Sequence, residues 1–159
     1  MSYELIQMAV DEATRGVESG EGGPFGALIV DEKGEILSLV HNECFKNTDP
    51  TAHAEVTAIR RACAKIGAIS LEGCVLYSSS YPCPMCLAAA MWAEIKFIYY
   101  AASLEECKAS GFDDMGRYDA VQNEREGKGH LLGRLCDGGS QHLEPFKKFQ
   151  VLRPDYFSR

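Results

Sequence analysis

The feature that most constrains the fold of this chain is the alternation of strand and helix patterns across residues 52–101. Residues 74–78 and 95–101 are short runs of β-branched, aromatic and other apolar residues, which is typical of strands. Residues 52–65 carry apolar side chains on one side of a predicted helix, and residues 82–93 form a second predicted helix. Because strands joined through a helix usually lie parallel in one sheet, we predict a layered α/β domain with parallel neighbours.

The N-terminal part adds a helix and a hairpin to this unit. Apolar residues recur at roughly helical spacing over residues 2–19, and glycines follow. Residues 27–30 and 36–40 are predicted to pair as a hairpin across a short polar turn. Pro82 is expected in the first turn of its helix, where a missing N–H costs nothing.

The periodic pattern fades beyond Gly111. Residues 127–140 are rich in glycine and are predicted to form a loop-rich connection. The tail, residues 145–159, mixes aromatic residues with Lys and Arg, and we expect it to dock on its own domain or on a partner subunit. With no linker or repeat in view, residues 1–159 are predicted to form a single domain.

Charge and hydropathy narrow the class of partner. The chain has 159 residues, with 16 Lys and Arg against 23 Asp and Glu, which gives a net charge of −7. Proteins that hold nucleic acid draw affinity from clustered cations, so this balance favours a small-molecule partner. No run approaches the length of a membrane span, and residues 1–10 lack a basic segment typical of a signal peptide. We therefore expect a cytoplasmic protein.

Seven cysteines are many for such a protein, and an odd number does not suggest a disulfide framework. Free cysteine usually behaves as a small buried apolar side chain. We expect this of five of them, namely Cys44, Cys63, Cys74, Cys107 and Cys136.

The remaining two, Cys83 and Cys86, belong to the motif that carries chemistry. Their spacing places both sulfurs on nearly one face of a helix start, where the helix dipole favours thiolate. His53 opens the other helix of the unit. Two thiolates and one imidazole suit Zn²⁺ and leave one tetrahedral position open for water, which is the pattern of a catalytic site. Glu55, two residues after His53, is then positioned to act on that water as proton shuttle.

This pattern, His-x-Glu followed by Pro-Cys-x-x-Cys, is a known signature of zinc nucleobase deaminases. A lone Cys-x-x-Cys is also compatible with a redox dithiol. A structural zinc clamp is a further alternative, and it requires a fourth protein ligand such as His41 or Cys44.

The two remaining histidines, His130 and His142, are expected at the surface.

The chain resembles the cytidine deaminase-like superfamily, and within it the bacterial guanine deaminases. The resemblance covers nearly the whole chain and is carried by these segments: Gly22–Ala27, Asp49–Arg60, Pro82–Leu87, Tyr99–Ala102 and Gly111–Asp114. It implies a three-layer α/β/α sandwich with a mixed central sheet, and a homodimer with exchanged tails. One departure is Tyr81, which stands where members of this family usually carry Glu.

The resemblance also implies roles for individual residues. It implies one Zn²⁺ on His53, Cys83 and Cys86, with Glu55 as acid–base and Asp114 as a second carboxylate at the substrate amine. It also implies Asn42 as a hydrogen-bonding group for the purine ring. The other candidates for substrate binding are Ala54, Phe25, Trp92 and Tyr156, of which Phe25 and Trp92 also fit the apolar core. From the sequence alone, Asn42 also fits a turn, and Asp113 and Asp114 also fit a helix cap.

The function predicted on this basis is hydrolytic deamination of a free purine base, guanine to xanthine and ammonia. Guanosine, another nucleoside, an aminopurine or a triazine remain open as substrates. A tRNA adenosine deaminase with the same zinc core is the alternative from another substrate class, and it predicts a basic surface that the acidic composition does not favour.

Overall fold

A four-stranded sheet in the order β2-β1-β3-β4 lies at the centre of the fold. Strand β1 (Gly26–Val30) pairs antiparallel with both β2 (Ile36–His41) and β3 (Val75–Ser80). Strand β3 pairs parallel with β4 (Phe97–Ala102). The sheet is therefore mixed, and its parallel pair is the one predicted from the strand–helix–strand order.

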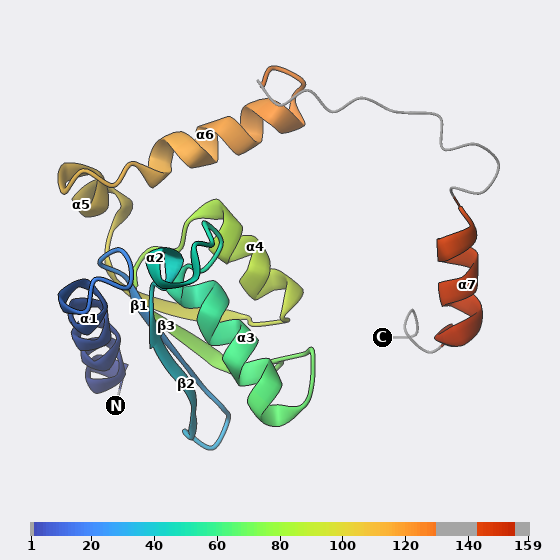
Figure 1. The fold of residues 1–159 in the computed structure, drawn as a ribbon, viewed down its shortest axis with the longest axis horizontal. Coiled ribbons are helices and arrows are strands. Elements are labelled where there is room, and N and C mark those ends of the chain that lie inside the picture. The colour runs from blue at the N-terminus through green and yellow to red at the C-terminus, as the bar shows by residue number, and fades with distance from the viewer. Residues whose placement is uncertain (1, 130–142, 155–159) are drawn as a thin grey trace. The chain divides into compact units, whose positions relative to one another are not determined.

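Helices cover both faces of this sheet. Figure 1 shows α1 (Ser2–Glu18) on one face, and α3 (Ala54–Ile66) and α4 (Pro84–Trp92) on the other. Alternate residues of β1 supply the two cores, since Ile29 packs in the cluster with α3 and α4 and Leu28 in the cluster with α1. All five residues of β1 are buried for this reason. The predicted three-layer α/β/α sandwich is confirmed.

The helix starts differ slightly from the predicted ones, in a way that matters for the site. Helix α3 begins at Ala54 with His53 as its N-cap, and α4 begins at Pro84 with Cys83 as its N-cap. The proline of the first turn is thus Pro84, and the expectation for Pro82 was wrong. Pro84 fits because the first helical residue needs no N–H partner, whereas Pro82 lies in the extended segment before the cap.

A short helix, α2 (Cys44–Asn47), precedes α3, and another short helix, α5 (Leu104–Ala109), follows β4. Beyond Gly111, where the sequence pattern fades, the chain forms helix α6 (Asp114–Arg125). Helix α6 has no buried residue, so the apolar periodicity that reveals a helix in a sequence is weak there. Helix α7 (Glu144–Leu152) is the last described element.

The computed structural model describes residues 2–129 and 143–154. The chain divides into two units, residues 1–129 and 130–159, and α7 belongs to the second. The predictions for Cys136, His130, His142 and Tyr156 lie outside the described residues. Within the described ranges, no helix is both long and apolar enough to span a membrane.

The cysteines outside the metal motif are only partly as predicted. Cys74 and Cys107 are buried, as expected of small apolar side chains. Cys44 and Cys63 are half-buried, because each lies on a helix near the surface rather than in the sheet.

Candidate active site

The three expected metal donors converge at the starts of two neighbouring helices. His53 and Cys83 are the N-cap residues of α3 and α4, and both have extended backbone conformations. Neither side chain caps its own helix, so both are free to point into the space between the two helix starts. Cys86 follows one turn into α4 and is completely buried.

The spacing of these donors tests whether a zinc ion fits. His53 Nδ1 lies 3.6 Å from Cys83 Sγ and 3.5 Å from Cys86 Sγ, and the two sulfurs are 3.5 Å apart. Tetrahedral Zn²⁺ with Zn–S of ~2.3 Å and Zn–N of ~2.0 Å places its ligands about 3.5–3.8 Å from one another. The three side chains therefore fit zinc in both chemistry and spacing.

Within residues 2–129 and 143–154, the donor set consists of His53, Cys83 and Cys86. Among the residues the structure describes, no fourth His, Cys, Asp or Glu donor lies within 4.8 Å of all three atoms. His41 is engaged elsewhere, since its Nδ1 and Nε2 each lie 2.8 Å from a carboxylate oxygen, of Glu12 and Glu21. Within the described residues, the structure therefore does not support a structural clamp through His41 or Cys44, and the three donors fit a site with one open position for water.

The electrostatics of the two cysteines, Cys83 and Cys86, favour a thiolate at Cys83 before any metal binds. The hydrogen bond with Cys86, ahead of the contact with His53, lowers the pKa of Cys83 to about 4. The same hydrogen bond and burial raise the pKa of Cys86. The Cys83 contact also raises the pKa of His53. A thiolate beside an imidazole at a helix N-terminus is a strong attractor for a soft cation.

Glu55 lies in the first turn of α3 and is buried. Its Oε1 accepts a hydrogen bond from Ser78 Oγ at 3.0 Å, and its Oε2 lies 3.4 Å from Cys86 Sγ. Burial raises the pKa of this carboxyl group. A carboxyl group that is buried next to the metal donors, and whose pKa is raised, is suited to exchange protons.

A cavity of about 340 Å³ opens onto these groups. His53, Glu55 and Cys83 form its floor, and Asp114 lines it from the first turn of α6. Burial raises the pKa of Asp114. Phe25 lines the wall and packs edge-to-face on Phe112 with ring centroids 5.2 Å apart. The cavity thus offers the carboxyl groups of Glu55, Asp113 and Asp114 and an aromatic wall to a flat polar molecule.

The expected substrate-binding residues differ in where they lie. Phe25 lines the cavity, whereas Ala54 is wholly buried at the first residue of α3. Asn42 is buried and is not among the residues that line the cavity, and its Oδ1 accepts hydrogen bonds from the backbone N–H groups of Gly23 and Cys44. That leaves the Asn42 Nδ2 amide as the group able to donate to a ligand.

Trp92 does not belong to the cavity. It lies at the last residue of α4, at the opposite end of the helix from Cys83, and its side chain is 84% exposed. The expectation that it walls the pocket was wrong, because two helical turns separate it from the metal donors. Asp113, by contrast, is the N-cap of α6 and accepts a hydrogen bond from Gly116 N, as one sequence interpretation predicted.

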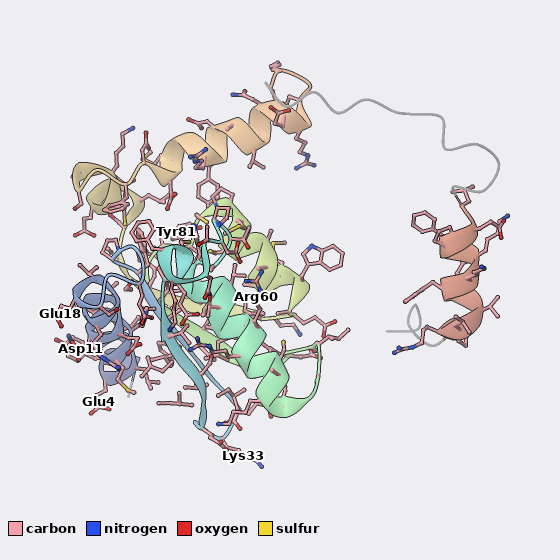
Figure 2. All side chains as sticks on the ribbon, in the orientation of Figure 1. Glu4, Asp11, Glu18, Lys33, Arg60 and Tyr81 are labelled. Atoms are coloured by element: carbon pink, nitrogen blue, oxygen red, sulfur yellow. The ribbon has the colours of Figure 1, made fainter. Side chains whose placement is uncertain are left out.

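Sequence reasoning missed three groups near the metal donors. Ser78 binds Glu55, and Tyr81, labelled in Figure 2, and Arg117 line the cavity. The available signal for Ser78 was its position in the strand that leads to the cysteine motif. Arg117 follows Asp114 by three residues, so a helix over this segment would have placed both on one face.

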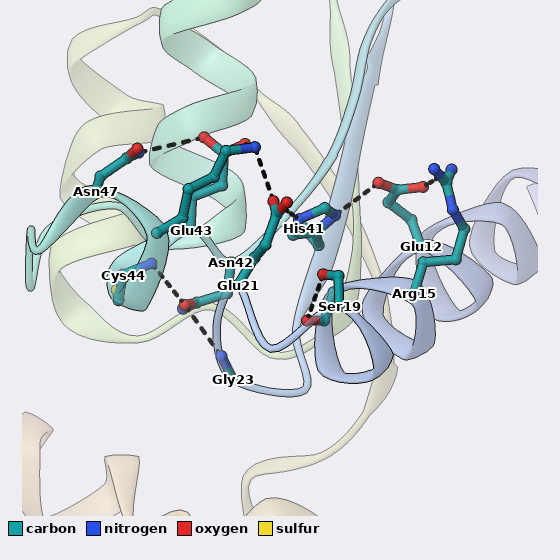
Figure 3. Close-up of polar contacts among 12 residues, drawn as sticks. Glu12, Arg15, Ser19, Glu21, Gly23, His41, Asn42, Glu43, Cys44 and Asn47 are labelled. Atoms are coloured by element: carbon teal, nitrogen blue, oxygen red, sulfur yellow. Dashed lines mark hydrogen bonds and ion pairs between the residues drawn. The ribbon is translucent and has the colours of Figure 1, made fainter.

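A second group of donors lies nearby and is also close enough for a metal. Atoms of Glu21, His41 and Glu43 all lie within 4.8 Å of one another. Figure 3 shows these residues in a network of ion pairs and hydrogen bonds that also includes Glu12. Lys46 adds ion pairs to both Glu21 and Glu43. Hydrogen bonds from Lys46 and then His41 lower the pKa of Glu21. Protein cations already occupy this group.

A mixed three-layer fold with His and two Cys donors, a buried Glu and an adjoining cavity defines a zinc-dependent hydrolytic deaminase. Residues 2–102 match the family model of the cytidine and deoxycytidylate deaminase zinc-binding region. The chain belongs to this family.

One relative within the family is similar to this chain over most of its length, and another is similar over part of it. Guanine deaminase from Bacillus subtilis is 42% identical over 151 residues, which are 94% of this chain and 95% of that protein. Its crystal structure superposes with a TM-score of 0.84 at 41% identity, covering 94% of this chain and 93% of that one. A tRNA-specific adenosine deaminase from Aquifex aeolicus is 44% identical over 98 residues, 62% of this chain and 64% of its own length.

Proposed function

We propose that this protein is a guanine deaminase, which hydrolyses guanine to xanthine and ammonia. The observation that carries the proposal is the cavity that Glu55 and Asp114 line together with two of the three metal donors, His53 and Cys83. The similarity to a guanine deaminase extends over 94% of the chain at 42% identity, whereas similarity to tRNA adenosine deaminases covers 62% at 44% identity or 82% at 30% identity. The region beyond residue 102, which carries Asp114, is thus shared with the guanine enzyme.

His53, Cys83 and Cys86 are the residues that would hold the metal. A bound zinc ion lowers the pKa of a water molecule towards ~7, so that a nucleophile is available at neutral pH. The protein's own groups must then move protons and orient the base. The spacing of the donors and the absence of a fourth one among the described residues support this assignment.

Glu55 has the central proton-transfer role. One of its carboxylate oxygens accepts a proton from a water molecule while the oxygen of that water attacks C2 of guanine. The resulting carboxylic acid then passes the proton to the substrate. Ser78 Oγ holds Glu55 Oε1, which leaves Oε2 on the side of the metal donors. Because the carboxyl group is buried, the proton is exchanged with the substrate rather than with bulk water.

Asp114 completes the reaction at the amino group. Its carboxyl group protonates or holds the departing nitrogen, so that ammonia rather than an amide anion leaves. The raised pKa that burial gives Asp114 suits a group that must carry a proton part of the time. In this proposal the Asn42 amide and the backbone N–H of Ala54 bind the polar edge of the purine, and Phe25, which lines the cavity, stacks against its face.

The substrate assignment is tested by an ammonia-release assay with the zinc-loaded protein. The substrates compared are guanine, guanosine, adenine, cytosine and an RNA stem-loop that carries adenosine. We expect turnover of guanine, confirmed by formation of xanthine. Deamination of adenosine in the stem-loop without turnover of guanine would contradict the proposal and assign the chain to the RNA class.

We further propose a homodimer in which the tail, residues 145–159, docks on the partner subunit and brings Tyr156 to the substrate. Helix α7 supports this, since Phe146, Val151 and Leu152 are exposed on it and need a covering surface. Light scattering at micromolar concentration should give the mass of a dimer. A monomer with a tail that proteases remove readily would contradict this proposal.

A further inference from the structure

Tyr118 joins α6 to the segment that carries the metal donors. Its hydroxyl group donates a hydrogen bond of 2.6 Å to the backbone carbonyl oxygen of Pro82. Pro82 is fully buried and directly precedes Cys83. Tyr118 itself lies one helical turn after Asp114. A single side chain therefore bridges the start of the cysteine motif and the helix that brings the second carboxyl group to the cavity.

We propose that Tyr118 is a positioning residue for deamination, which fixes Asp114 over the cavity through its hydrogen bond to Pro82. The inference deepens the proposed function and rests on the role given there to Asp114. Tyr118 does not line the cavity, and its hydroxyl is committed to a backbone carbonyl. It therefore acts through the helix and not on the substrate.

Helix α6 contacts α4 and α5 but contributes no buried residue to the core, so a directional bond to the metal-site segment matters for its position. None of its residues is buried, and its surface is mostly charged or polar. Its N-terminus is tied locally, by the Asp113 cap and by an ion pair of 3.5 Å between Asp113 and Lys108 of the preceding helix. The bond from Tyr118 ties the helix instead to a rigid buried segment 36 residues earlier in the chain. Small displacements of a catalytic group cost much of its effect.

The aromatic ring of Tyr118 makes a separate contact that a test can leave intact. Tyr81 lies between two tyrosines, with its ring centroid 6.2 Å from that of Tyr118 and 4.9 Å from that of Tyr100 on β4. Tyr118→Phe retains the ring, and with it the packing on Tyr81, and removes only the hydroxyl. Loss of the hydrogen bond is thereby separated from loss of packing.

The test is a double-mutant cycle with guanine as substrate. Tyr118→Phe is made in the wild-type chain and in Asp114→Asn, and kcat/KM and zinc content are measured for each. We expect Tyr118→Phe to lower kcat/KM about tenfold in the wild type and less than about twofold in Asp114→Asn, with zinc content unchanged. Tyr99→Phe is the matched control, since it removes a hydroxyl group from a half-exposed tyrosine on β4 that stacks on Tyr77. It should leave kcat/KM unchanged.

A second readout does not depend on activity. Amide hydrogen exchange in α6 should become faster in Tyr118→Phe, while exchange in α3 stays as in the wild type. An equal loss of kcat/KM in both backgrounds, loss of zinc in Tyr118→Phe, or unchanged exchange in α6 would overturn the inference. If the wild type does not turn over guanine, the proposed function fails, whereas the exchange in α6 still reports whether the bond fixes this helix.

Discussion

Each of two regions of this molecule brings three side chains that could bind a metal within 4.8 Å of one another. The two regions differ in which cations neutralise the charge of these side chains. In the first, His53 and two cysteines meet at helix starts, and each donor is within reach of the other two. In the second, Glu21, His41 and Glu43 lie among cations of the chain itself. Proximity of donors is common to both, so proximity alone does not identify a metal site.

Each carboxylate of the second region forms an ion pair with a cationic side chain of the protein. Lys46 Nζ lies 2.8 Å from Glu21 and 3.5 Å from Glu43, and Arg61 lies 2.6 Å from Glu43. The network joins α1, β2, α2 and α3, as Figure 3 shows in part. It therefore stabilises the edge of the sheet, whereas the first region has soft donors that require an external cation.

Replacing one residue in each region should give the largest difference, which is a difference in bound zinc. Cys86→Ala removes a metal ligand, and we expect loss of bound zinc and of all measurable deamination. His41→Ala should retain zinc, although it leaves Glu12 and Glu21 without their shared partner and lowers thermal stability. Elemental analysis of both purified variants is the measurement. Retention of full zinc content by Cys86→Ala would refute the assignment of the ligand.

Glu55→Gln should produce the next largest effect. The amide can still accept a hydrogen bond from Ser78 but cannot take a proton, so kcat should fall by ~10²–10⁴ while zinc content stays the same. Glu21→Gln is the control from the second region, and its kcat is expected to stay within about threefold of wild type. Near-normal turnover in Glu55→Gln would show that another group transfers the proton.

Asp114→Asn should have a smaller effect than Glu55→Gln. Asp114 acts at the leaving nitrogen and is half-buried, so we expect kcat for guanine to fall by about 10–100-fold. Steady-state kinetics with guanine, together with elemental analysis, measures this. If the variant lost zinc, Asp114 would be required for the metal site itself.

The smallest effect is expected in the charged network and depends on pH. Burial raises the pKa of Glu43, but the interactions with Arg61, Lys46 and Asn47 together, those with Arg61 the largest among them, lower the pKa overall. A carboxylate with a lowered pKa stabilises the fold above its unfolded value of ~4.5, and this contribution is lost as pH falls through the folded value. Arg61→Met should therefore cost ~1 kcal/mol at pH 7 and less at pH 3, since Arg61 is half exposed.

Arg60→Met on the same helix is the control for this measurement. Arg60, labelled in Figure 2, makes a longer ion pair of 3.6 Å with the partly exposed Asp49. Urea unfolding at both pH values should show a smaller change for Arg60→Met than for Arg61→Met. Equal costs for the two variants, or a cost for Arg61→Met that grows at pH 3, would contradict the account.

The two regions also differ in how far the sequence could predict them. The zinc donors were predictable because each sits in a short motif at a helix start, and the flanking strands have strong apolar patterns. The network around His41 joins residues far apart in the chain, and charged surface residues carry no periodic signal. Tyr118 was missed for a similar reason, since α6 is polar on all sides and its bond to Pro82 spans 36 residues. Trp92 was misassigned because the interpretation rested on its aromatic side chain, although the predicted helix over residues 82–93 already placed it at the end away from Cys83.

X-ray absorption spectroscopy at the zinc edge, with elemental analysis of the same sample, tests the contrast between the two regions most directly. We predict about one zinc ion per chain, with two sulfur ligands at ~2.3 Å and two lighter ligands at ~2.0–2.1 Å, from His53 and water. His41→Ala should give the same spectrum. A second zinc ion per chain, or a first shell with fewer than two sulfurs, would contradict the assignment of the metal to His53, Cys83 and Cys86 alone.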